Sequence, residues 1–344
     1  MNKVINKVNS RRDVDMGEML TYRRAHDSIG ELAFIERYVS PRATDAVVAE
    51  DGTIHAFHVA IPNADGSPSR YAFIAHTDSV HNRQNPEPRQ KVAYDATMQQ
   101  FIVADPKQRD CLGADDAAGC YVLCRMIDAG VPGLYVFFRN EERGGIGSGY
   151  VADHRQDLVA GIDAAIQFDR RGTRSIITQM SCGLTCSDAF ANSLSVALGM
   201  GHELDPTGSF TDPANLIYLV PECTNISVGY DAEHSAAESQ AAWYIEALAA
   251  RCITVFAAET RLAIVGVTDA ERWGDAAGYG QAMPYDVDLC DMTDADLSWI
   301  VDNNTPEVVV GLLKAARDEL ADLRYGDVDV DEIDFTPWGR DYRD

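Results

Sequence analysis

The sequence predicts a three-layer α/β fold (αβα) with a mixed, mostly parallel central sheet. Short apolar runs with the length of buried strands alternate with longer segments of helical periodicity, which is the pattern of parallel strands joined by crossover helices. The chain has 344 residues, of which 46% are apolar. It is therefore long enough for one large domain or two smaller ones around a substantial core.

The first predicted element is one helix over Met16–Val39. Apolar residues recur there near helical spacing, although Gly30 weakens the middle of the segment. Residues 45–50 and 53–61 follow as two strands. The Asp51-Gly52 dipeptide between them is typical of a tight hairpin turn.

Two apolar runs, Tyr71–Ala75 and Leu134–Phe138, are short enough to be buried strands of the sheet. Residues 79–110, between these strands, are polar and contain several Pro and Gln, so they predict a loop or a small hairpin over the site. A helix is predicted from Leu112 to Ile127 and ends before Gly130.

The second half of the chain supplies the rest of the predicted sheet. Its short apolar runs predict three strands, at Ala164–Phe168, Leu216–Val220 and Asn225–Gly229. Residues 187–198 read as a helix. A long alanine-rich helix is predicted from Ser235 to Ala258, because Glu238 stands three residues after Ser235 as in a capping box.

The charge of the chain excludes some partners. Its net charge is 29 − 54 = −25, whereas binding to nucleic acid or to an anionic membrane needs clustered positive charge. No run approaches the roughly 18 apolar residues of a membrane span, and the basic start lacks the apolar run of a signal peptide. The eight Cys form no Cys-x-x-Cys pair. We therefore expect a reduced, cytoplasmic protein without a structural zinc knuckle.

The character of the chain changes after residue 260. From Pro284 to Asp344 there are 17 acidic and 5 basic residues, a net charge of 5 − 17 = −12. We expect residues 1–260 to form the catalytic domain. Residues 261–344 are then expected to form an acidic C-terminal appendage, packed on that domain or capping it.

Seven polar residues follow predicted strands or begin a predicted helix: His76, Asp78, Asp115, Glu141, Glu142, Asp169 and His234. Ligands collect at the carboxyl ends of strands in an open α/β sheet. Taken singly, each residue has an ordinary structural explanation, such as a helix cap or a solvated turn. Five of the seven, two imidazoles and three carboxylates, suit a pair of divalent metal ions, most simply Zn²⁺ with Co²⁺ or Mn²⁺ as substitutes.

The order of these motifs resembles the zinc-dependent exopeptidases of the M28, M20 and M42 superfamily. The motifs are His-x-Asp from His76, Gly-Ala-Asp-Asp-x-x-Gly from Gly113, Asn-Glu-Glu-x-Gly-x-x-Gly-Ser from Asn140, then Asp169 and His234. The resemblance covers about residues 16–260. It implies a phosphorylase/hydrolase-like fold, and a cis peptide bond between Asp115 and Asp116.

The same resemblance implies a role for each candidate residue. His76 and Asp169 would bind one ion, Glu142 and His234 the other, and Asp115 would bridge both. Glu141 would be the general base, and Asp78 would orient His76.

Two spacings separate the chain from parts of that superfamily. M20 enzymes insert a lid or dimerisation domain before the final His, but here Asp169 and His234 are only 65 positions apart. M42 enzymes insert a β-domain after the first His, but His76 and Asp115 are only 39 positions apart. A single-domain, M28-like enzyme is the better match. Thr211-Asp212 also resembles a Thr-Asp near the substrate pocket of such enzymes.

The sequence therefore predicts a di-zinc hydrolase that cleaves amide bonds of short peptides. The leading hypothesis is an aminopeptidase in which Glu141 activates a metal-bridging water. A carboxypeptidase or an N-acyl amino acid deacylase could use the same site, because Arg143, Arg170 and Arg171 either clamp a substrate carboxylate or only neutralise the crowded acids. The expected partners are thus a small peptide or an acyl amino acid, and a homo-oligomer is one expected state.

Two further hypotheses come from other classes. A non-catalytic scaffold would retain the fold without turnover, although no ligand and no base is missing from the sequence. A thiol hydrolase would use Cys111, Cys182 or Cys223, but the sequence suggests no Cys-His pairing.

Overall fold

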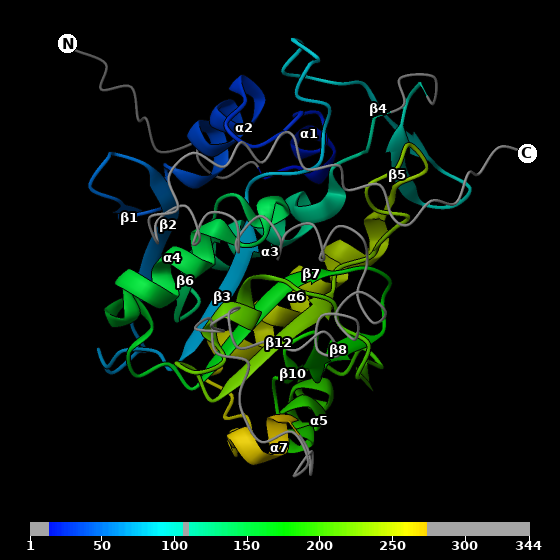
Figure 1. Cartoon of the computed structure of the whole chain (residues 1–344). Coiled ribbons are helices and arrows are strands. Elements are labelled where there is room, and N and C mark those ends of the chain that lie inside the picture. Colours follow the sequence, from blue (N-terminus) through cyan, green and yellow to red (C-terminus); the bar gives the residue numbers. More distant parts are fainter. Residues whose placement is uncertain (1–13, 106–109, 274–344) are drawn as a thin grey trace, which may run out of the picture. The chain divides into compact units, whose positions relative to one another are not determined.

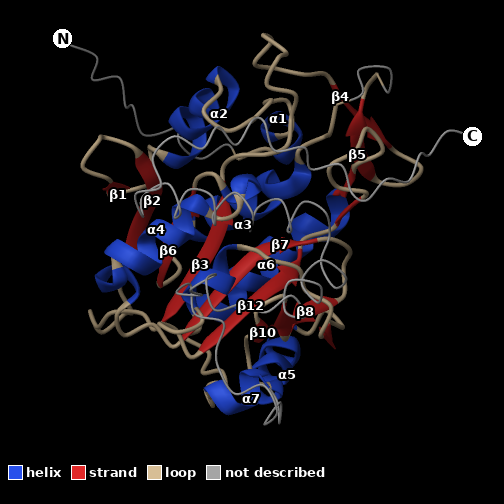
Figure 2. Cartoon of the chain, in the orientation of Figure 1, coloured by secondary structure: helices blue, strands red, loops and turns tan. Residues whose placement is uncertain are grey.

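The computed structural model describes residues 14–105 and 110–273. Its centre is an eight-stranded sheet in the order β1-β2-β6-β3-β7-β12-β8-β11 (Figures 1 and 2). The strands are β1 Asp45–Val48, β2 Ile54–Ile61, β3 Tyr71–His76, β6 Gly133–Phe138, β7 Ala164–Arg170, β8 Ser175–Ile177, β11 Glu203–Asp205 and β12 Glu222–Ser227. The four central strands β6, β3, β7 and β12 run parallel, whereas β1, β2 and β8 make antiparallel pairings. The predicted fold class, a mixed and mostly parallel α/β sheet, is confirmed.

Helices cover both faces of this sheet. They are α3 Ala114–Asp128, α5 Asp188–Leu198 and α6 Ala242–Ala257 on one face, and α4 Ile146–His154 on the other, with 3-10 turns at Gln156–Val159 and Asp212–Leu216. Side chains alternate between the faces along each strand, so Phe73 packs under α3 and α6 while Ile74 packs under α4. None of the helices in the described part of the chain is long and apolar enough to cross a membrane.

A smaller sheet has four strands in the order β13-β14-β5-β4. Its strands are β4 Val92–Asp95, β5 Gln100–Val103, β13 Tyr230–Asp231 and β14 Ser239–Ala241, and a separate two-stranded ribbon consists of β9 Gln179–Met180 and β10 Gly183–Leu184. Residues 79–110 were predicted to form a loop or a small hairpin, and they contain the hairpin β4–β5. This small sheet joins the hairpin to the segment that carries His234.

The prediction of one helix over Met16–Val39 is wrong. The segment forms α1 Met16–Met19 and α2 Ile29–Phe34, and α2 continues as a π-helix over Ile35–Val39. A new helix starts at α2 because the Ser28 hydroxyl accepts the backbone N–H of Glu31 at 3.1 Å. The residues before it turn inward and bury Arg24 completely.

The strand predicted at Leu216–Val220 is also wrong. The chain there ends a 3-10 turn, Asp212–Leu216, which has Pro213 in its first positions. Leu216 and Val220 are both buried in the core beneath α4. Residues four positions apart lie on the same face of a helical turn and also on the same face of a strand, so this spacing is compatible with both structures. Pro213 favours the turn.

The helix predicted from Ser235 begins only at Ala242. Residues Ser239–Ala241 pair with β5 and β13 as a strand. Glu238 does not cap its own helix, because its carboxylate binds backbone N–H groups at the start of α3. The predicted capping box is therefore absent.

Residues 261–273 pack against the sheet domain. The backbone N–H of Leu262 donates to the Tyr71 hydroxyl at 2.9 Å, and Arg272 in α7 (Asp269–Trp273) donates to the carbonyl of Ile217 at 3.0 Å. The rest of the predicted appendage, from residue 274 on, lies outside the described residues. The domain division at residue 260 and the packed or capping role of the appendage stay predictions.

Candidate active site

The candidate ligands come from the carboxyl edge of the central sheet and from one loop beside it. His76 is the last residue of β3, Asp169 lies near the end of β7, and Asp115 lies in the first turn of α3. Glu141 and Glu142 form a 3-10 turn after β6. His234 follows β13, which is one strand of the small sheet, and has a positive φ of 61°.

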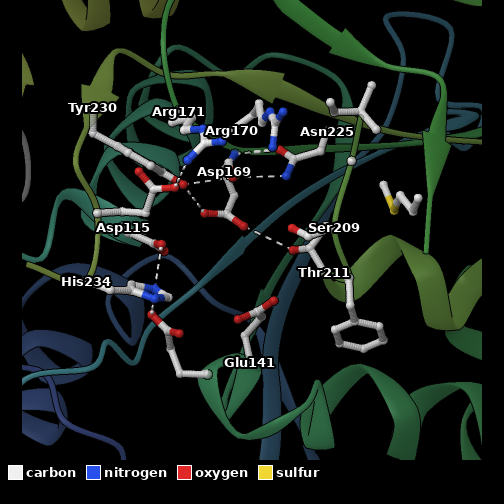
Figure 3. A pocket seen from close by; sticks show the side chains of 16 residues that line it. Asp115, Glu141, Asp169, Arg170, Arg171, Ser209, Thr211, Asn225, Tyr230 and His234 are labelled. Atoms are coloured by element: carbon white, nitrogen blue, oxygen red, sulfur yellow. Dashed lines mark hydrogen bonds and ion pairs between the residues drawn. The ribbon is translucent and has the colours of Figure 1, made fainter. Parts of the chain in front are cut away.

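The fold brings all five predicted metal ligands together around Asp115. Nε2 of His76 lies 3.1 Å from Oδ1 of Asp115 and 3.6 Å from Oδ1 of Asp169. On the other side, Nε2 of His234 lies 3.2 Å from both Oδ2 of Asp115 and Oε1 of Glu142. In Figure 3, Asp115, Asp169 and His234 point into the same space as Glu141. The two oxygens of Asp115 thus face one imidazole each.

The donor atoms fit a pair of divalent cations. Both ring nitrogens of His76, Oδ1 of Asp115 and Oε1 of Glu142 are buried without a hydrogen-bond partner among the described residues. Buried polar atoms are rarely left without partners, and imidazole nitrogen with carboxylate oxygen is a donor set suited to zinc. The assignment of these residues as ligands stays a prediction that this geometry supports.

The charges of the cluster favour added positive charge. Burial and the nearby Asp115 raise the pKa of Glu142 to about 7 and that of Asp169 to about 6. The ion-pair contacts of His234, first with Asp115 and then with Glu142, raise its pKa to about 11. Burial opposes charge on His76, but its contacts with Asp115, Asp169 and Asp78 outweigh burial and raise its pKa well above the usual range. Each of these four groups thus has a raised pKa, which means that it binds a proton more strongly than it does in water.

Asp78 lies behind this cluster. Its Oδ1 is 3.5 Å from Nδ1 of His76. The same carboxylate accepts the backbone N–H groups of Glu141 at 3.1 Å and Glu142 at 3.2 Å. Asp78 is completely buried, so it can fix both the imidazole of His76 and the turn that carries the two glutamates.

Glu141 borders the same space without belonging to the ligand set. Its Oε2 lies 3.9 Å from Nε2 of His76. Burial, and then the negative charges of Asp212 and Asp169, raise the pKa of Glu141 well above its usual range, against the effect of His76. A carboxylate with a raised pKa next to a reactive centre is suited to accept and return a proton.

The pocket beside the cluster has two different ends. It encloses about 610 Å³, part of which is open solvent. One end is apolar, with Ile177, Met180 and Phe210 around Gly208. At the other end Arg171 pairs with Glu233 at 3.0 Å. The pocket can therefore hold an apolar group and a charged group at once.

The three arginines proposed as carboxylate clamps differ in position. Arg170 and Arg171 line the pocket, whereas Arg143 does not and donates to His26 at 2.9 Å. Arg170 also pairs with Asp205 at 3.2 Å. Arg171 is the most accessible of the pocket pair, because 57% of its side chain is exposed compared with 14% for Arg170.

Thr211 and Asp212 have separate positions. Thr211 lines the pocket and donates to Oδ2 of Asp169 at 3.0 Å. Asp212 is completely buried and is not among the lining residues. Burial raises the pKa of Asp212 to about 7.

Several residues that support the site were missed in the sequence. Asn225 fixes Asp169 by accepting its N–H at 2.8 Å and donating to its carbonyl at 3.0 Å, and the Tyr230 hydroxyl also donates to Asp169. Glu238 and Arg24 hold the backbone next to Asp115. Asn225 and Tyr230 could have been identified only from their position near strand ends. No local sequence signal indicates Glu238 or Arg24.

A second group of metal-compatible side chains, His81, Asp110 and Cys111, lies away from the pocket. Arg23 already neutralises Asp110 through an ion pair of 3.1 Å. This group also provides the Cys-His neighbours that the sequence did not suggest. Both residues are buried, however, and burial raises the pKa of the Cys111 thiol far above its usual range. Such a thiol is not a nucleophile.

Solved structures share this fold at low sequence identity. The aminopeptidase PepT from Bacillus cereus matches with a TM-score of 0.55 and 12% identity over 70% of this chain and 96% of that chain. A tripeptidase from Staphylococcus aureus matches with a TM-score of 0.55 and 12% identity over 71% and 96% of the two chains. The PhTET1-12s dodecamer matches with a TM-score of 0.52 and 15% identity over 72% and 100%. At these identities the likeness shows a common fold.

Sequence comparisons give no family assignment. No protein-family model matches the chain, and no curated protein sequence matches it.

Proposed function

We propose that the protein is a metal-dependent aminopeptidase that removes the first residue of short peptides, with two Zn²⁺ ions as its resident metals. The observation that carries this proposal is the position of Asp115, whose two oxygens face His76 at 3.1 Å and His234 at 3.2 Å beside Glu141. The fold that this chain shares with solved aminopeptidases supports it.

The residues divide into two ligand sets. His76 and Asp169 would bind one cation, Glu142 and His234 the other, and Asp115 both. When bound, the two cations would polarise the scissile carbonyl and lower the pKa of a water molecule. Glu141 would take the proton of that water and return it to the leaving amine. Asp78 would hold His76 and the turn of Glu141 in the required orientation.

The free amino group of a peptide has a suitable partner in Glu233. This residue lines the pocket, and Arg171 binds its Oε1 at 3.0 Å. Its Oε2 is buried without a hydrogen-bond partner among the described residues. An oxygen fixed in this way would accept a hydrogen bond from a substrate ammonium group.

The apolar end of the pocket suggests where the substrate side chain would lie. Ile177, Met180 and Phe210 offer an apolar surface, so apolar first residues are the expected substrates. The limited space favours short peptides.

The connections between the candidate ligands support a single-domain, M28-like organisation. The segment from Asp169 to His234 forms β8, α5, β11 and β12 of the sheet domain. The segment from His76 to Asp115 contains only the β4–β5 hairpin among its described residues. Neither segment leaves room for an inserted lid domain.

A carboxypeptidase or N-acyl amino acid deacylase is the second candidate, and Arg171 favours it. Its guanidinium lines the pocket and is largely exposed, so it could bind a substrate carboxylate. Its pairing with Glu233 favours the aminopeptidase instead, because the carboxylate position is already taken.

The test compares free, N-acetylated and C-amidated Leu-containing dipeptides with metal content measured on the same sample. An aminopeptidase cleaves the free and the C-amidated forms and leaves the N-acetylated form intact. The second candidate cleaves the N-acetylated form and needs the free carboxylate. Two bound metal ions without turnover on all forms would instead favour the non-catalytic scaffold.

The proposal also includes the location of the protein in the cell and its oligomeric state. The seven described cysteines are all free, which supports a reducing, cytoplasmic location. PhTET1-12s is a dodecamer, which supports a homo-oligomer here. Light scattering of the purified protein tests the oligomer, and fractionation of the producing cell tests the location.

A further inference from the structure

The backbone that carries Asp115 is irregular and cannot satisfy its own hydrogen bonds. Gly113 has a left-handed φ of 73° and provides no side-chain cap for α3. Asp115 and Asp116 have non-helical dihedral angles and a cis peptide bond between them. The N–H groups at the start of a helix have no partner inside the helix, so other residues must bind those of residues 113–115.

Glu238 binds all three N–H groups. Its Oε2 accepts from Gly113 at 2.8 Å, and its Oε1 accepts from Ala114 at 2.7 Å and from Asp115 at 3.1 Å. Glu238 is 1% exposed, and no basic side chain of the described residues forms an ion pair with it. Its position four residues after His234 ties the loop of one candidate ligand to the backbone of another.

Arg24 binds the carbonyl groups of the same backbone. Its Nη2 donates to Gly113 at 2.8 Å and to Asp115 at 3.2 Å, and its Nε donates to Thr77 at 2.9 Å. Thr77 stands between His76 and Asp78, so Arg24 ties the end of β3 to the bridging residue. Arg24 is completely buried, and within the described part of the chain no carboxylate lies within ion-pair distance of it.

These two side chains are costly to bury. An ionised group without a partner of opposite charge is strongly unfavourable inside a protein. Glu238 instead accepts the N–H groups of Gly113, Ala114 and Asp115. Arg24 donates to the carbonyl groups of Gly113 and Asp115 and to that of Thr77, the residue after His76. The two side chains therefore converge on the peptide groups of Gly113 and Asp115, the backbone that carries the candidate bridging residue.

We propose that Arg24 and Glu238 are positioning residues that together fix the bridging carboxylate of Asp115 for two cations. This inference rests on the proposed function, since it concerns the same metal centre. Arg24 sets the distance between His76 and Asp115, and Glu238 sets the distance between Asp115 and His234. Neither touches the substrate or the cations.

The test measures cation binding in Glu238→Gln and Arg24→Met by calorimetric titration with Zn²⁺ and by the visible absorption of bound Co²⁺. Both variants should bind cations about 10- to 100-fold more weakly than wild type, the usual effect of changing a residue that orients a ligand. The Co²⁺ spectrum should change shape, and kcat should fall more than KM rises. Glu238→Asp and Arg24→Lys, which keep the charges, should recover part of the affinity.

Two matched controls separate positioning from general destabilisation. Glu222→Gln removes another fully buried carboxylate, which accepts backbone N–H groups of Ser187, Val265 and Gly266. Arg42→Met removes another buried guanidinium, which pairs with Asp128. Both should lower thermal stability and leave the Zn²⁺ affinity and the Co²⁺ spectrum as in wild type.

The outcomes distinguish this inference from the proposed function. If wild type binds two cations and the Glu238 and Arg24 variants bind them equally well, the positioning role is wrong and the proposed function stands. If wild type binds no cation pair, the proposed function itself fails. Should Glu238→Gln or Arg24→Met not fold, the Asp and Lys variants carry the same comparison, because each shortens or rearranges the contacts while it preserves the buried charge.

Discussion

Nε2 of His234 lies 3.2 Å from Oδ2 of Asp115, and the two side chains differ sharply in exposure. His234 is 49% exposed, whereas Asp115 is 11% exposed. On the other side of Asp115, the side chain of His76 is completely buried. The two halves of the candidate metal centre are therefore unequal: one faces the interior and the other faces solvent.

This inequality predicts different losses in two variants. His234→Ala should lower the affinity for one cation at least about 100-fold and leave the affinity for the other unchanged. Asp115→Ala should lose both cations. Equilibrium dialysis followed by elemental analysis gives the number of ions bound. Two ions retained in Asp115→Ala would rule out the bridging role.

Glu141→Gln should lower kcat by about 100- to 10,000-fold, because the amide cannot accept the proton of the attacking water. Metal content should stay at the wild-type value, since Glu141 is outside the ligand set. Steady-state kinetics on a cleaved dipeptide, with metal analysis of the same preparation, checks both parts. A rate near that of wild type would mean that another group is the base.

Glu233→Gln should raise KM about 10-fold or more for peptides with a free amino group, because a hydrogen bond to a charged group is lost. The value of kcat should change little. Glu246→Gln provides a control, since Glu246 is a glutamate that pairs with an arginine, Arg125, on α3. An unchanged KM in Glu233→Gln would remove Glu233 from amine recognition.

Phe210→Ala should change substrate preference at the apolar end of the pocket. The preference in kcat/KM for a large apolar first residue over alanine should fall about 10-fold or more, since the loss of apolar contact costs about 1–3 kcal/mol. Parallel assays on Leu-Gly and Ala-Gly measure this ratio. Phe210 is only partly buried, so folding should be preserved, and an unchanged ratio would place the substrate side chain elsewhere.

His202 should make the fold sensitive to acid. Burial lowers its pKa to about 4, whereas the unfolded chain takes up this proton near pH 6.5. The stability from the neutral imidazole is complete above about pH 6.5 and is lost as the pH falls toward 4. Between pH 7.5 and 4.5 the loss amounts to about 2 kcal/mol.

Urea unfolding of wild type and His202→Gln at these two pH values measures that contribution. His202 bonds to the Tyr244 hydroxyl at 2.7 Å, so the variant should be less stable at pH 7.5. Wild type should then lose more stability on acidification than the variant does. Equal losses would show that His202 is not buried in its neutral form.

The sequence predicted the centre of the molecule better than its periphery. His76 and Asp169 follow short apolar runs that were predicted as buried strands and are strands, and parallel strands bring their carboxyl ends to one edge. The short runs before them contain enough information to place both side chains on the same side of the sheet. The cis peptide bond between Asp115 and Asp116 was implied by the resemblance and is present.

Arg24 and Glu238 could not be assigned from the sequence. Each lies in a segment whose periodicity predicts a continuous helix. Contacts with residues far away in the sequence interrupt both predicted helices. Both side chains form hydrogen bonds with the backbone of residues 113–115. These contacts join residues far apart in the sequence, so no local sequence pattern indicates them. For the same reason Asn225 and Tyr230, which hold Asp169, look like ordinary strand-end residues.

The small sheet has a consequence for how the protein is made. Residues 113–115 need Arg24 from the start of the described chain and Glu238 from near its end. A ribosome that has released the chain only as far as β12 has exposed neither His234 nor Glu238. Loading of the proposed cation pair would therefore follow synthesis of the small sheet, and a chain halted earlier would hold at most one of the two ions.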